Sequence, residues 1–292
     1  MTVFSIVVTY NPCLDTLKEL LHALVPQVHA VKIIDNNSTV NVSAWLEQQQ
    51  LATVSVQSLT TNKGVATAHN KGIQWAQAQQ AEFVLLMDQD SIPAPDMVAK
   101  LLNTLQQDSN IAAVGPKYRD IKGSHQSPFV KLVGCKLCRM ACADHEVVAV
   151  DHLVSSGSLI SMTALQKVGV MQEQLFIDYV DTEWCLRAVH KGYTLLGVGA
   201  AQMTHSIGDQ QVSIFGRKLA VHSPLRQFYV IRNGLWLLRQ PWVSWHWRCM
   251  DIQRLFLIYI TYSLFVGKRL QNWQMMNKGI WQAITRKMGP HK

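Results

Sequence analysis

The stretch FVLLMDQDS at residues 83–91 decides the fold class of this chain. Five apolar residues run directly into Asp88-Gln89-Asp90, which indicates a short buried strand that ends in polar side chains. Strand and helix signals alternate around it. Strands are expected at 4–10, 31–34, 53–59, 83–87 and 111–114, and helices at 14–24, 42–50, 65–80 and 96–107. This repeated β-α-β pattern predicts an α/β fold with a mostly parallel central sheet and helices on both faces.

Polar motifs follow three of these strands. They are Thr9-Tyr10-Asn11, Asp35-Asn36-Asn37-Ser38 and Asp88-Gln89-Asp90. In open α/β sheets, ligands bind in the crevice at the carboxyl ends of the strands. The three motifs are therefore expected to converge on one binding site. For Asp35 and Asn36 the alternative is a turn stabilised by a local side-chain hydrogen bond.

Asp88 and Asp90 are candidates for a divalent metal site. Two carboxylates that lie two residues apart on an extended strand point the same way, and hard cations prefer such oxygen ligands. An Mg²⁺ or Mn²⁺ ion there would bridge two phosphates of a nucleotide and offset the charge of a departing diphosphate. The alternative is a solvated loop in which Asp90 or Ser91 caps a helix.

The second part of the chain has a different character. Gly, Ser, Pro and scattered charges from 117 to 147 suggest loops or a flap, before an ordered stretch at 154–162, a helix at 180–190 and strands near 193–198 and 201–205. Amphipathic helices are expected at 223–239, 243–266 and 272–286. We therefore divide the chain into a catalytic domain at 1–210 and a helical region at 211–292.

Charge is distributed unevenly over the 292 residues. Up to Gln211 there are 14 Lys and Arg against 18 Asp and Glu, whereas from Val212 onward there are 13 against one, Asp251. Six of the 9 Trp also lie in this basic part. Basic, aromatic and apolar residues together favour a helix in a lipid interface over one that follows nucleic acid. A dimer interface, or packing on the catalytic domain, is the alternative.

The remaining compositional features concern the compartment. The apolar run Leu255–Gly267 has 13 residues, too few for a membrane span of about 20. The N-terminus has no basic segment followed by a long apolar one, so we expect a cytoplasmic protein with reduced cysteines. Cys135, Cys138 and Cys142 lack the two-pair spacing of structural zinc sites and are interpreted as free thiols, with zinc as the alternative.

A set of short segments resembles glycosyltransferase family two, whose members have the GT-A fold and invert the anomeric centre. The segments lie between about residues 3 and 235, in order and with plausible spacing. They are VVTYNP at 7–12, DNNS at 35–38, TNKGVATAHNKGI at 61–73, LLMDQDS at 85–91, SSGSLI at 155–160, DYVDTEWCLRA at 178–188 and LRQFYVIRN at 225–233. The forms DQDS, SSGSLI and LRQFYVIRN most resemble the rhamnosyltransferase branch, which uses dTDP-L-rhamnose.

This resemblance implies roles for single residues around the donor. Thr9, Tyr10 and Asn11 would line the nucleoside pocket, Asp35 would hydrogen-bond the base or ribose, and Lys63-Gly64 would let backbone and ammonium approach the nucleotide. Asp88 would lie near the ribose, and Asp90 would hold the metal. Some relatives place a histidine near His205 as a further metal ligand, although a lone histidine is more often an ordinary structural residue.

Arg226 and Arg232 lie on one side of a predicted helix, with Tyr229 between them. Their two guanidinium groups would bind a diphosphate. The alternative is an ordinary basic amphipathic helix. Ser156 and Gly157 are assigned to the acceptor site.

Asp181 matches the catalytic base of the family. One carboxylate must remove the proton from the acceptor hydroxyl as the oxygen attacks the sugar. Asp181 and Glu183 point apart at helical spacing, so only one of them can serve. The alternative for this acidic cluster is a helix N-terminus whose acids favour the macrodipole. Trp184 would stack on the acceptor sugar, with core packing as the alternative.

The expected enzyme moves L-rhamnose from dTDP-L-rhamnose to a polyprenyl-diphosphate-linked sugar in bacterial O-antigen or capsule assembly. It would use Mg²⁺ or Mn²⁺, lie on the inner face of the inner membrane and bind no nucleic acid. It could form a homodimer. Two alternatives remain: the same mechanism with a UDP-sugar donor, and a non-catalytic membrane scaffold. A nucleotidyltransferase is disfavoured because VVTYNP supplies no Gly-rich basic loop after the first strand.

Overall fold

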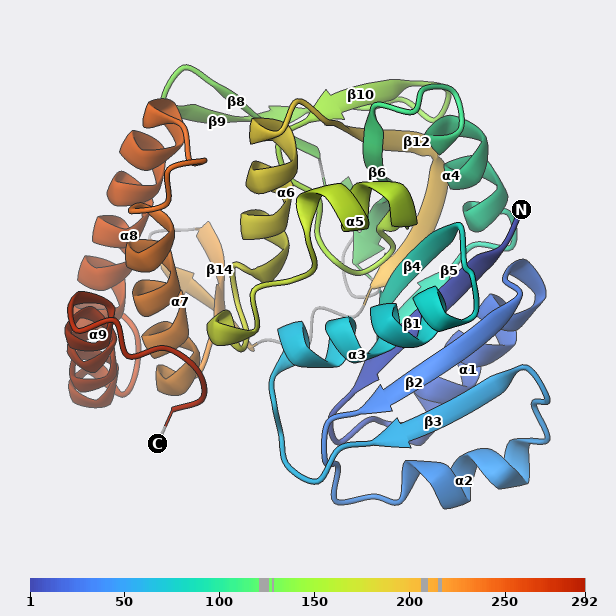
Figure 1. Ribbon diagram of the computed structural model, residues 1–292. Coiled ribbons are helices and arrows are strands. Elements are labelled where there is room, and N and C mark those ends of the chain that lie inside the picture. Colours follow the sequence, from blue (N-terminus) through green and yellow to red (C-terminus); the bar gives the residue numbers. More distant parts are fainter. Residues whose placement is uncertain (121–125, 128, 206–209, 215–216, 292) are drawn as a thin grey trace.

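The computed structural model shows one large mixed sheet with helices on both faces, and a helical bundle beside it (Figure 1). It describes residues 1–120, 126–127, 129–205, 210–214 and 217–291. The elements up to the end of the first β-α repeats are β1 (Val3–Thr9), α1 (Leu14–Leu24), η1 (Val25–Gln27), β2 (Ala30–Asp35), α2 (Val42–Gln49), β3 (Val54–Ser58), α3 (Val65–Ala78), β4 (Phe83–Asp88), β5 (Ser91–Pro93), α4 (Met97–Leu105) and β6 (Ile111–Asp120).

The second half contains further strands and most of the remaining helices. These elements are β7 (Gln126–Ser127), β8 (Phe129–Val133), β9 (Lys136–Met140), β10 (Val147–Val150), β11 (Leu159–Ser161), α5 (Met162–Val168), η2 (Glu173–Leu175), α6 (Val180–His190), β12 (Thr194–His205), β13 (Gln210–Ile214), β14 (Arg217–Val221), α7 (Pro224–Leu237), α8 (Trp245–Leu264) and α9 (Arg269–Ile284).

The main sheet has the strand order β10-β12-β6-β11-β4-β1-β2-β3. Strands β3, β2, β1 and β4 run parallel, as the β-α-β pattern predicts. The short strand β11 lies antiparallel between β4 and β6, and β10 and β5 pair antiparallel with β12. The predicted α/β class is confirmed, and the sheet is mixed beyond β4.

Both faces of the sheet are buried because apolar residues occupy consecutive strand positions. Val84 and Leu86 of β4 belong to the core under α3, α5 and α6, whereas Leu85 and Met87 face the core under α1, α2 and α4. Adjacent side chains of a strand point to opposite faces, so one run of apolar residues supplies both cores. Helix α1 contributes Leu17, Leu20, Leu21 and Leu24 at helical spacing.

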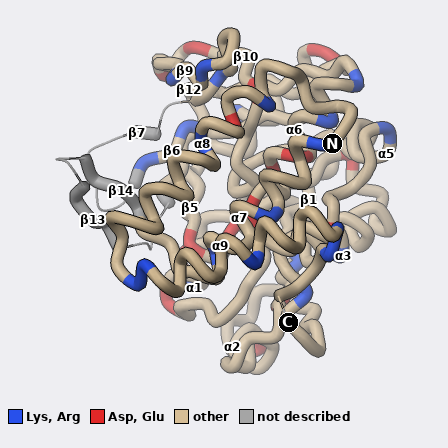
Figure 2. Tube along the Cα trace, turned by 90° about the vertical axis from the view of Figure 1, so that its left-hand side faces the viewer, with Lys and Arg blue, Asp and Glu red and all other residues tan. Residues whose placement is uncertain are grey.

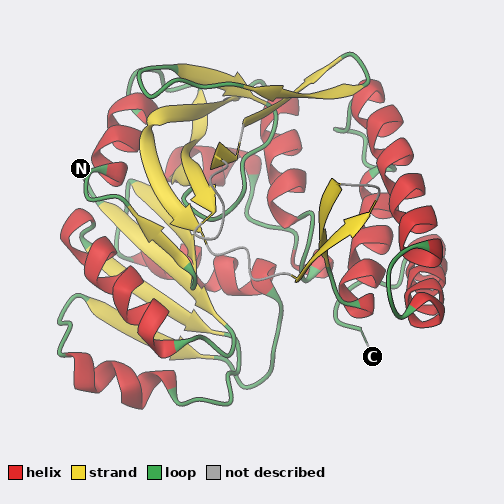
Figure 3. Cartoon of the chain, turned by 180° about the vertical axis from the view of Figure 1, so that it is seen from behind, coloured by secondary structure: helices red, strands yellow, loops and turns green. Residues whose placement is uncertain are grey.

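The C-terminal helices form a third core beside the sheet (Figure 3). Ile231 and Leu237 of α7, Leu255 of α8 and Met276 of α9 pack together there, with Leu186 of α6 at the boundary. The helical bundle therefore packs against the sheet domain through α6. The division near residue 210 stays a prediction.

Two predicted regions differ in detail from the structure. The stretch 117–147, predicted as loops or a flap, contains the hairpin of β8 and β9, and the ordered stretch 154–162 includes the strand Leu159–Ser161. Ser155–Ser158 form a tight turn, closed by a hydrogen bond from Ser158 N to Ser155 O of 3.0 Å, with Gly157 at a φ of +83°. The two strands expected near 193–205 are one strand, β12, with a register shift between Val198 and Gln202.

Candidate functional site

The three polar motifs converge at one edge of the sheet, as the sequence predicts. Thr9 pairs with Asp35 across β1 and β2, and Val8 pairs with Asp88 across β1 and β4. The hydroxyl of Thr9 donates a hydrogen bond of 2.9 Å to Oδ1 of Asp35, and both residues are buried. Parallel strands thus place Asp35, Thr9 and Asp88 side by side at their carboxyl ends.

Asp35 takes part in a local turn as well. Its Oδ2 accepts a hydrogen bond of 3.0 Å from the backbone N of Ser38, and its Oδ1 accepts one from the Ser38 hydroxyl. The turn alternative is therefore present in the structure. Since a carboxylate has about four acceptor positions, it leaves capacity for a further donor.

Neighbouring loops are tied to this edge through side-chain amides. Gln89 accepts a hydrogen bond of 2.7 Å from the backbone N of Tyr10, whose side chain is 50% exposed. Asn11 has a φ of +49°, and its Oδ1 accepts from Thr39 N at 2.8 Å. The backbone of Tyr10 is thus joined to the segment that follows β4, and its ring stays exposed.

Lys63 and Gly64 lie at the start of α3, beside the same edge. The backbone N of Lys63 donates a hydrogen bond of 2.8 Å to Oδ1 of Asn36, and the Lys63 side chain is exposed. Gly64 has a φ of +84°, and a Cβ there would lie 2.4 Å from the carbonyl oxygen of Phe176. Gly64 is therefore needed where α3 approaches the chain before α6.

The Asp88-Gln89-Asp90 segment is held by hydrogen bonds to the buried Ser156. Ser156 Oγ accepts a hydrogen bond of 3.0 Å from Asp88 N and donates one of 2.7 Å to Ser91 Oγ. Asp88 and Asp90 are half-buried. Ser156 is 3% exposed, so this arrangement corrects the expectation that it binds the acceptor: its hydroxyl is used inside the protein.

Gly157 likewise has a packing role. A Cβ at Gly157 would lie 2.6 Å from Cγ of Pro116 and 2.8 Å from Sδ of Met203. The glycine allows the turn to approach β6 and β12. The expectation of an acceptor contact at Gly157 is corrected in the same way, because the residue is buried against protein.

Backbone pairing brings the end of β12 to the aspartates. His205 lies opposite Ser91 in the antiparallel pair of β12 and β5, and Ser91 directly follows Asp90 in the sequence. The side chain of His205 is outside the described part of the structure. Among the side chains that are described, no group of three or more His, Cys, Asp or Glu is arranged to hold a metal.

Asp181 lies at the first turn of α6 and faces His152. Nε2 of His152 is 3.8 Å from Oδ2 of Asp181, whose side chain is 26% exposed. Burial raises the pKa of Asp181, but the nearby imidazole of His152 and the backbone N–H groups of Thr182 and Ser155 outweigh this effect, so the pKa lies below its ordinary value. The carboxylate is ionised and oriented at neutral pH.

Neighbouring serines connect Asp181 to Asp88. Ser155 and Asp181 line the same small cavity, and the hydroxyl of the next residue, Ser156, accepts a hydrogen bond from the backbone N of Asp88. Residues 88 and 181, distant in sequence, are therefore brought to one place. Glu183 points the other way and forms a buried ion pair with Arg187 at 2.8 Å, as helical spacing predicts.

The segment before α6 has an unusual backbone. Phe176, Asp178 and Tyr179 have φ values of +67°, +59° and +64°. Nδ2 of Asn233 donates hydrogen bonds to the carbonyl oxygens of Leu175, Ile177 and Asp178, at 2.9, 2.7 and 3.1 Å. Such conformations cost about 1–3 kcal/mol each and persist where neighbours fix them. Helix α7 fixes the segment that leads to Asp181.

Arg226 is the accessible basic residue of the predicted diphosphate grip. Its Nε donates a hydrogen bond of 3.1 Å to Oδ1 of Asp178, and its side chain is 41% exposed. Burial raises the pKa of Asp178, and the charge of Arg226 partly offsets this effect. Arg226 therefore stays a candidate for phosphate contact beside the segment before α6.

Arg232 and Tyr229 were expected at the diphosphate, but the structure buries them. Arg232 is 0% exposed and donates hydrogen bonds to the carbonyl oxygens of Leu175 and Gly289, at 3.2 and 2.6 Å. Tyr229 is 3% exposed, and its hydroxyl accepts from His291 N at 2.7 Å. Burial lowers the pKa of Arg232 to about 10. The C-terminal residues cover both side chains, which corrects this part of the prediction.

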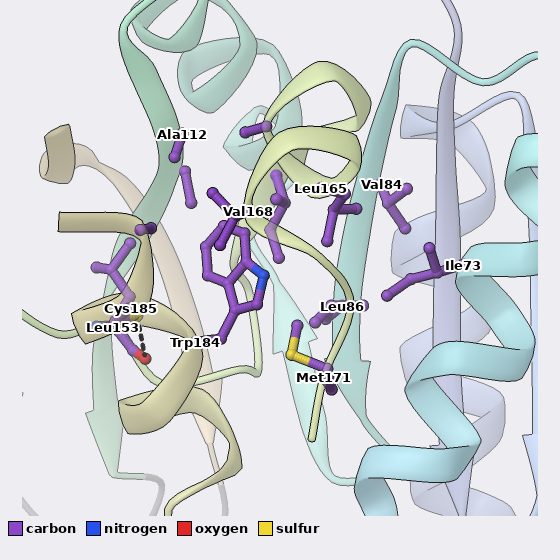
Figure 4. Close-up of a cluster of buried hydrophobic side chains, with 14 of the residues drawn as sticks. Ile73, Val84, Leu86, Ala112, Leu153, Leu165, Val168, Met171, Trp184 and Cys185 are labelled. Atoms are coloured by element: carbon purple, nitrogen blue, oxygen red, sulfur yellow. Dashed lines mark hydrogen bonds between the residues drawn. The ribbon is translucent and has the colours of Figure 1, made fainter. Parts of the chain in front are cut away.

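Trp184 is a core residue. Its ring is 2% exposed among Leu165, Val168 and Met171, and Nε1 donates a hydrogen bond of 2.8 Å to the carbonyl oxygen of Gly169 (Figure 4). Stacking on an acceptor sugar would need an exposed ring face. The core-packing alternative holds.

Two histidines near Asp181 are not among the predicted site residues. His152 follows β10, and His69 lies in α3, within the predicted helix 65–80. A signal for His69 was available, because Ala66, His69, Ile73 and Ala76 follow helical spacing and all are buried on one face of α3. A histidine within an apolar stripe indicates a buried polar group.

The cysteines are free thiols in the described residues. Cys138 belongs to strand β9 of the hairpin, Cys135 lies in its turn, and Cys142 is buried. The predicted free-thiol state is consistent with this arrangement.

Comparison with known proteins identifies the class and then the family. Carboxylates at the ends of parallel strands, with a separate aspartate nearby, suit a ligand-binding site of an α/β enzyme. The chain belongs to glycosyl transferase family 2, whose family model matches residues 5–169. It is a glycosyltransferase enzyme, as its sequence motifs predict.

Similar proteins support this assignment over the full chain. A dTDP-rhamnosyl transferase, RfbF of Shigella flexneri, is 31% identical over 97% of this chain and 94% of its own length. A low-salt glycan biosynthesis hexosyltransferase, Agl10 of Haloferax volcanii, is 22% identical over 79% of this chain and 76% of its own length.

Solved structures show the same fold. TarS of S. aureus, residues 1–349, superposes with a TM-score of 0.62 at 17% identity, covering 97% of this chain and 81% of that one. GalNAc-T7 with UDP, GalNAc and Mn²⁺ gives a TM-score of 0.60 at 14% identity, covering 90% and 57%. The GT-A expectation for the catalytic domain is confirmed at the level of fold.

Proposed function

We propose that this enzyme transfers L-rhamnose from dTDP-L-rhamnose during the assembly of a bacterial surface polysaccharide. The observation that carries the proposal is the 31% identity to a dTDP-rhamnosyl transferase over 97% of the chain. The strand-end site supplies carboxylates and a buried Thr9–Asp35 pair for a nucleotide, and Asp181 supplies a base.

The proposed reaction is a single displacement with inversion. The acceptor hydroxyl oxygen forms a bond to the anomeric carbon as the bond from that carbon to the diphosphate breaks, and Asp181 takes the hydroxyl proton. The lowered pKa of Asp181 keeps it ionised before attack. The backbone N of Thr182 donates a hydrogen bond of 2.7 Å to Oδ1 of Asp181, and Nε2 of His152 lies 3.8 Å from Oδ2, so both groups would help to orient the base.

The donor set at the end of β4 fits a hard divalent cation. Asp90, with His205 opposite Ser91 in register, would hold Mg²⁺ or Mn²⁺, and Asp88 would lie at the ribose. A bound cation would offset the charge that develops on the diphosphate. Arg226 adds a positive group at the other side of Asp178.

The proposed acceptor is a sugar on a polyprenyl diphosphate, at the cytoplasmic face of the bacterial inner membrane. Support comes from α8 and α9, which expose apolar and aromatic side chains beside Lys and Arg; Figure 2 turns this side to the viewer. The exposed set is Trp245, Ile252, Phe256, Leu257, Leu264, Phe265, Leu270, Trp273, Trp281 and Ile284. Within the described residues no helix is long and apolar enough to cross a bilayer. Such a surface suits a helix that lies in the lipid interface.

The substitution Asp181→Asn tests the proposed function. We expect rhamnosyl transfer to fall by about 10² to 10⁴, since the base is lost, while dTDP affinity changes little because Asp181 is not part of the nucleotide pocket. Transfer is measured with radiolabelled donor and lipid-linked acceptor, and dTDP binding by calorimetry. Substantial residual turnover would reject Asp181 as the base.

The main alternative is a UDP-sugar donor in the same site. Binding of dTDP and UDP, each with Mn²⁺, separates the two, because only a thymidine pocket must accommodate the C5 methyl. Preference for UDP would replace the rhamnosyl proposal with a hexosyl one. A non-catalytic scaffold would show neither transfer nor donor hydrolysis that is lost on chelation.

A further inference from the structure

A buried histidine shares a small cavity with Asp181. His69 of α3 is 0% exposed, and neither ring nitrogen has a hydrogen-bond partner among the described residues. His69, Asp181, Ser155 and Ser158 are the polar residues that line this cavity, and Leu86 and Trp184 belong to its apolar wall. A buried polar group without a partner costs about 1–3 kcal/mol, so its retention needs an explanation.

The cavity has room for about one water molecule. A buried water needs two or more polar partners, and the cavity lining offers the imidazole of His69 and the carboxylate of Asp181. Ser158 Oγ already donates a hydrogen bond to the carbonyl oxygen of Val154, so it contributes at most an acceptor. A water in this position would satisfy one of the two ring nitrogens of His69 and would account for the polar lining.

We propose that His69 is a positioning residue, whose imidazole holds a buried water against the carboxylate of Asp181. The ring N–H donates to the water oxygen, and the water donates to the carboxylate on the side away from His152. This inference rests on the proposed function, because it assigns His69 to the base. His152 and the water then hold Asp181 from two directions, and its rotamer is fixed for the acceptor hydroxyl.

The protonation state of His69 fits this arrangement. Burial lowers the pKa of His69 to about 4, partly offset by the charge of Asp181, so the ring is neutral at physiological pH. A neutral ring has one N–H donor, which the water uses. Three other titratable groups face Asp181. His152 lies in the segment after β10, Asp178 lies in the segment before α6, and Cys185 lies in α6 itself.

The first test is the pH dependence of turnover in His69→Leu and His69→Gln. Leucine fills the site without a donor, whereas glutamine keeps an N–H near the same position. We expect His69→Leu to raise the apparent pKa of the acid limb of kcat by about one unit, because a hydrogen bond to the charged carboxylate is lost. His69→Gln is expected to bring the limb back toward that of the unchanged protein. An acid limb that is identical in the unchanged protein and His69→Leu would overturn the proposal.

The second test needs no activity. Ring ¹⁵N shifts of His69 report its tautomer, and we expect a single neutral tautomer from pH 5 to 8 that changes in Asp181→Asn. Unaltered His69 shifts in that variant would contradict the contact. If Asp181→Asn keeps its turnover, the proposed base fails, and the ¹⁵N comparison alone then decides whether His69 and Asp181 interact. Thermal unfolding of each variant confirms that it is folded.

Discussion

At the scale of single residues, the pair of Arg226 and Asp178 makes stability depend on pH. Burial raises the pKa of Asp178, so the folded protein binds this proton more tightly than the unfolded chain does. The cost of the buried charge is absent at low pH and appears as pH rises through the raised pKa. Arg226 reduces that cost, although its side chain is 41% exposed and its effect is screened.

Arg226→Gln should therefore destabilise the fold at pH 8 by about 1–2 kcal/mol and at pH 4 by much less. Urea unfolding at both pH values measures the difference. Arg139→Gln, the same change at an exposed residue of β9, is the control and should have little effect at either pH. A loss in Arg226→Gln that is equal at both pH values, or larger at pH 4, would contradict this account.

Residues at strand ends could be predicted from the sequence, and residues on later helices could not. Thr9, Asp35 and Asp88 come together because parallel strands align their carboxyl ends whatever covers them. Arg232 was misplaced because its environment is set by Gly289, which lies 57 positions further along the chain. Helical spacing shows that side chains share a face, but not what packs on that face.

At the scale of elements, Tyr179 connects α8 to the segment that leads to Asp181. Its hydroxyl donates to the carboxylate of Asp251 at 2.8 Å and also contacts the guanidinium of Arg254. Asp251 is 1% exposed and accepts from Nε of Arg254 at 2.8 Å. The buried carboxylate of Asp251 and the guanidinium of Arg254 thus hold Tyr179, whose φ is +64°, against α8.

Tyr179→Phe should destabilise the protein by about 1–3 kcal/mol, because it leaves the buried Asp251 with one donor fewer. It should also slow transfer by about tenfold, since the segment before Asp181 loses its anchor. Urea unfolding and kcat measure the two effects. Tyr259→Phe is a matched control, because its hydroxyl bonds Asn277 between α8 and α9, away from this segment. Equal loss of turnover in both variants would show that the anchor has no specific role.

The accuracy of the sequence prediction also varied by element. Helices Leu14–Leu24 and Val180–His190 were predicted with their observed bounds, because a regular apolar stripe marks each turn. The hairpin of Phe129–Val133 and Lys136–Met140 was read as a loop. Its residues are mostly half-buried or exposed, so they carry little alternation of apolar and polar side chains.

At the scale of the whole molecule, the exposed apolar surface lies on the same bundle that holds the segment before Asp181. Asn233 of α7 and Asp251 of α8 contact residues 175–179, while Phe256 and Leu257 of α8 are 64% and 62% exposed. Under the proposed function, an interfacial position for α8 would bring the site toward a lipid-linked acceptor. Composition predicted this basic, Trp-rich region, but only the structure identifies the exposed side chains.

The double substitution Phe256→Glu and Leu257→Glu should release the protein from anionic vesicles. Each change removes about 1.5–3 kcal/mol of apolar burial in lipid and adds a charge that anionic lipids repel. We therefore expect affinity to fall by at least about a hundredfold in a flotation assay. Val40→Glu, at a residue that is 37% exposed beside α2, is the control and should bind as the unchanged protein does. Unchanged vesicle binding in the double variant, with a dimer that becomes a monomer in light scattering, would assign this surface to self-association, because the same apolar area cannot be covered by lipid and by a second copy at once.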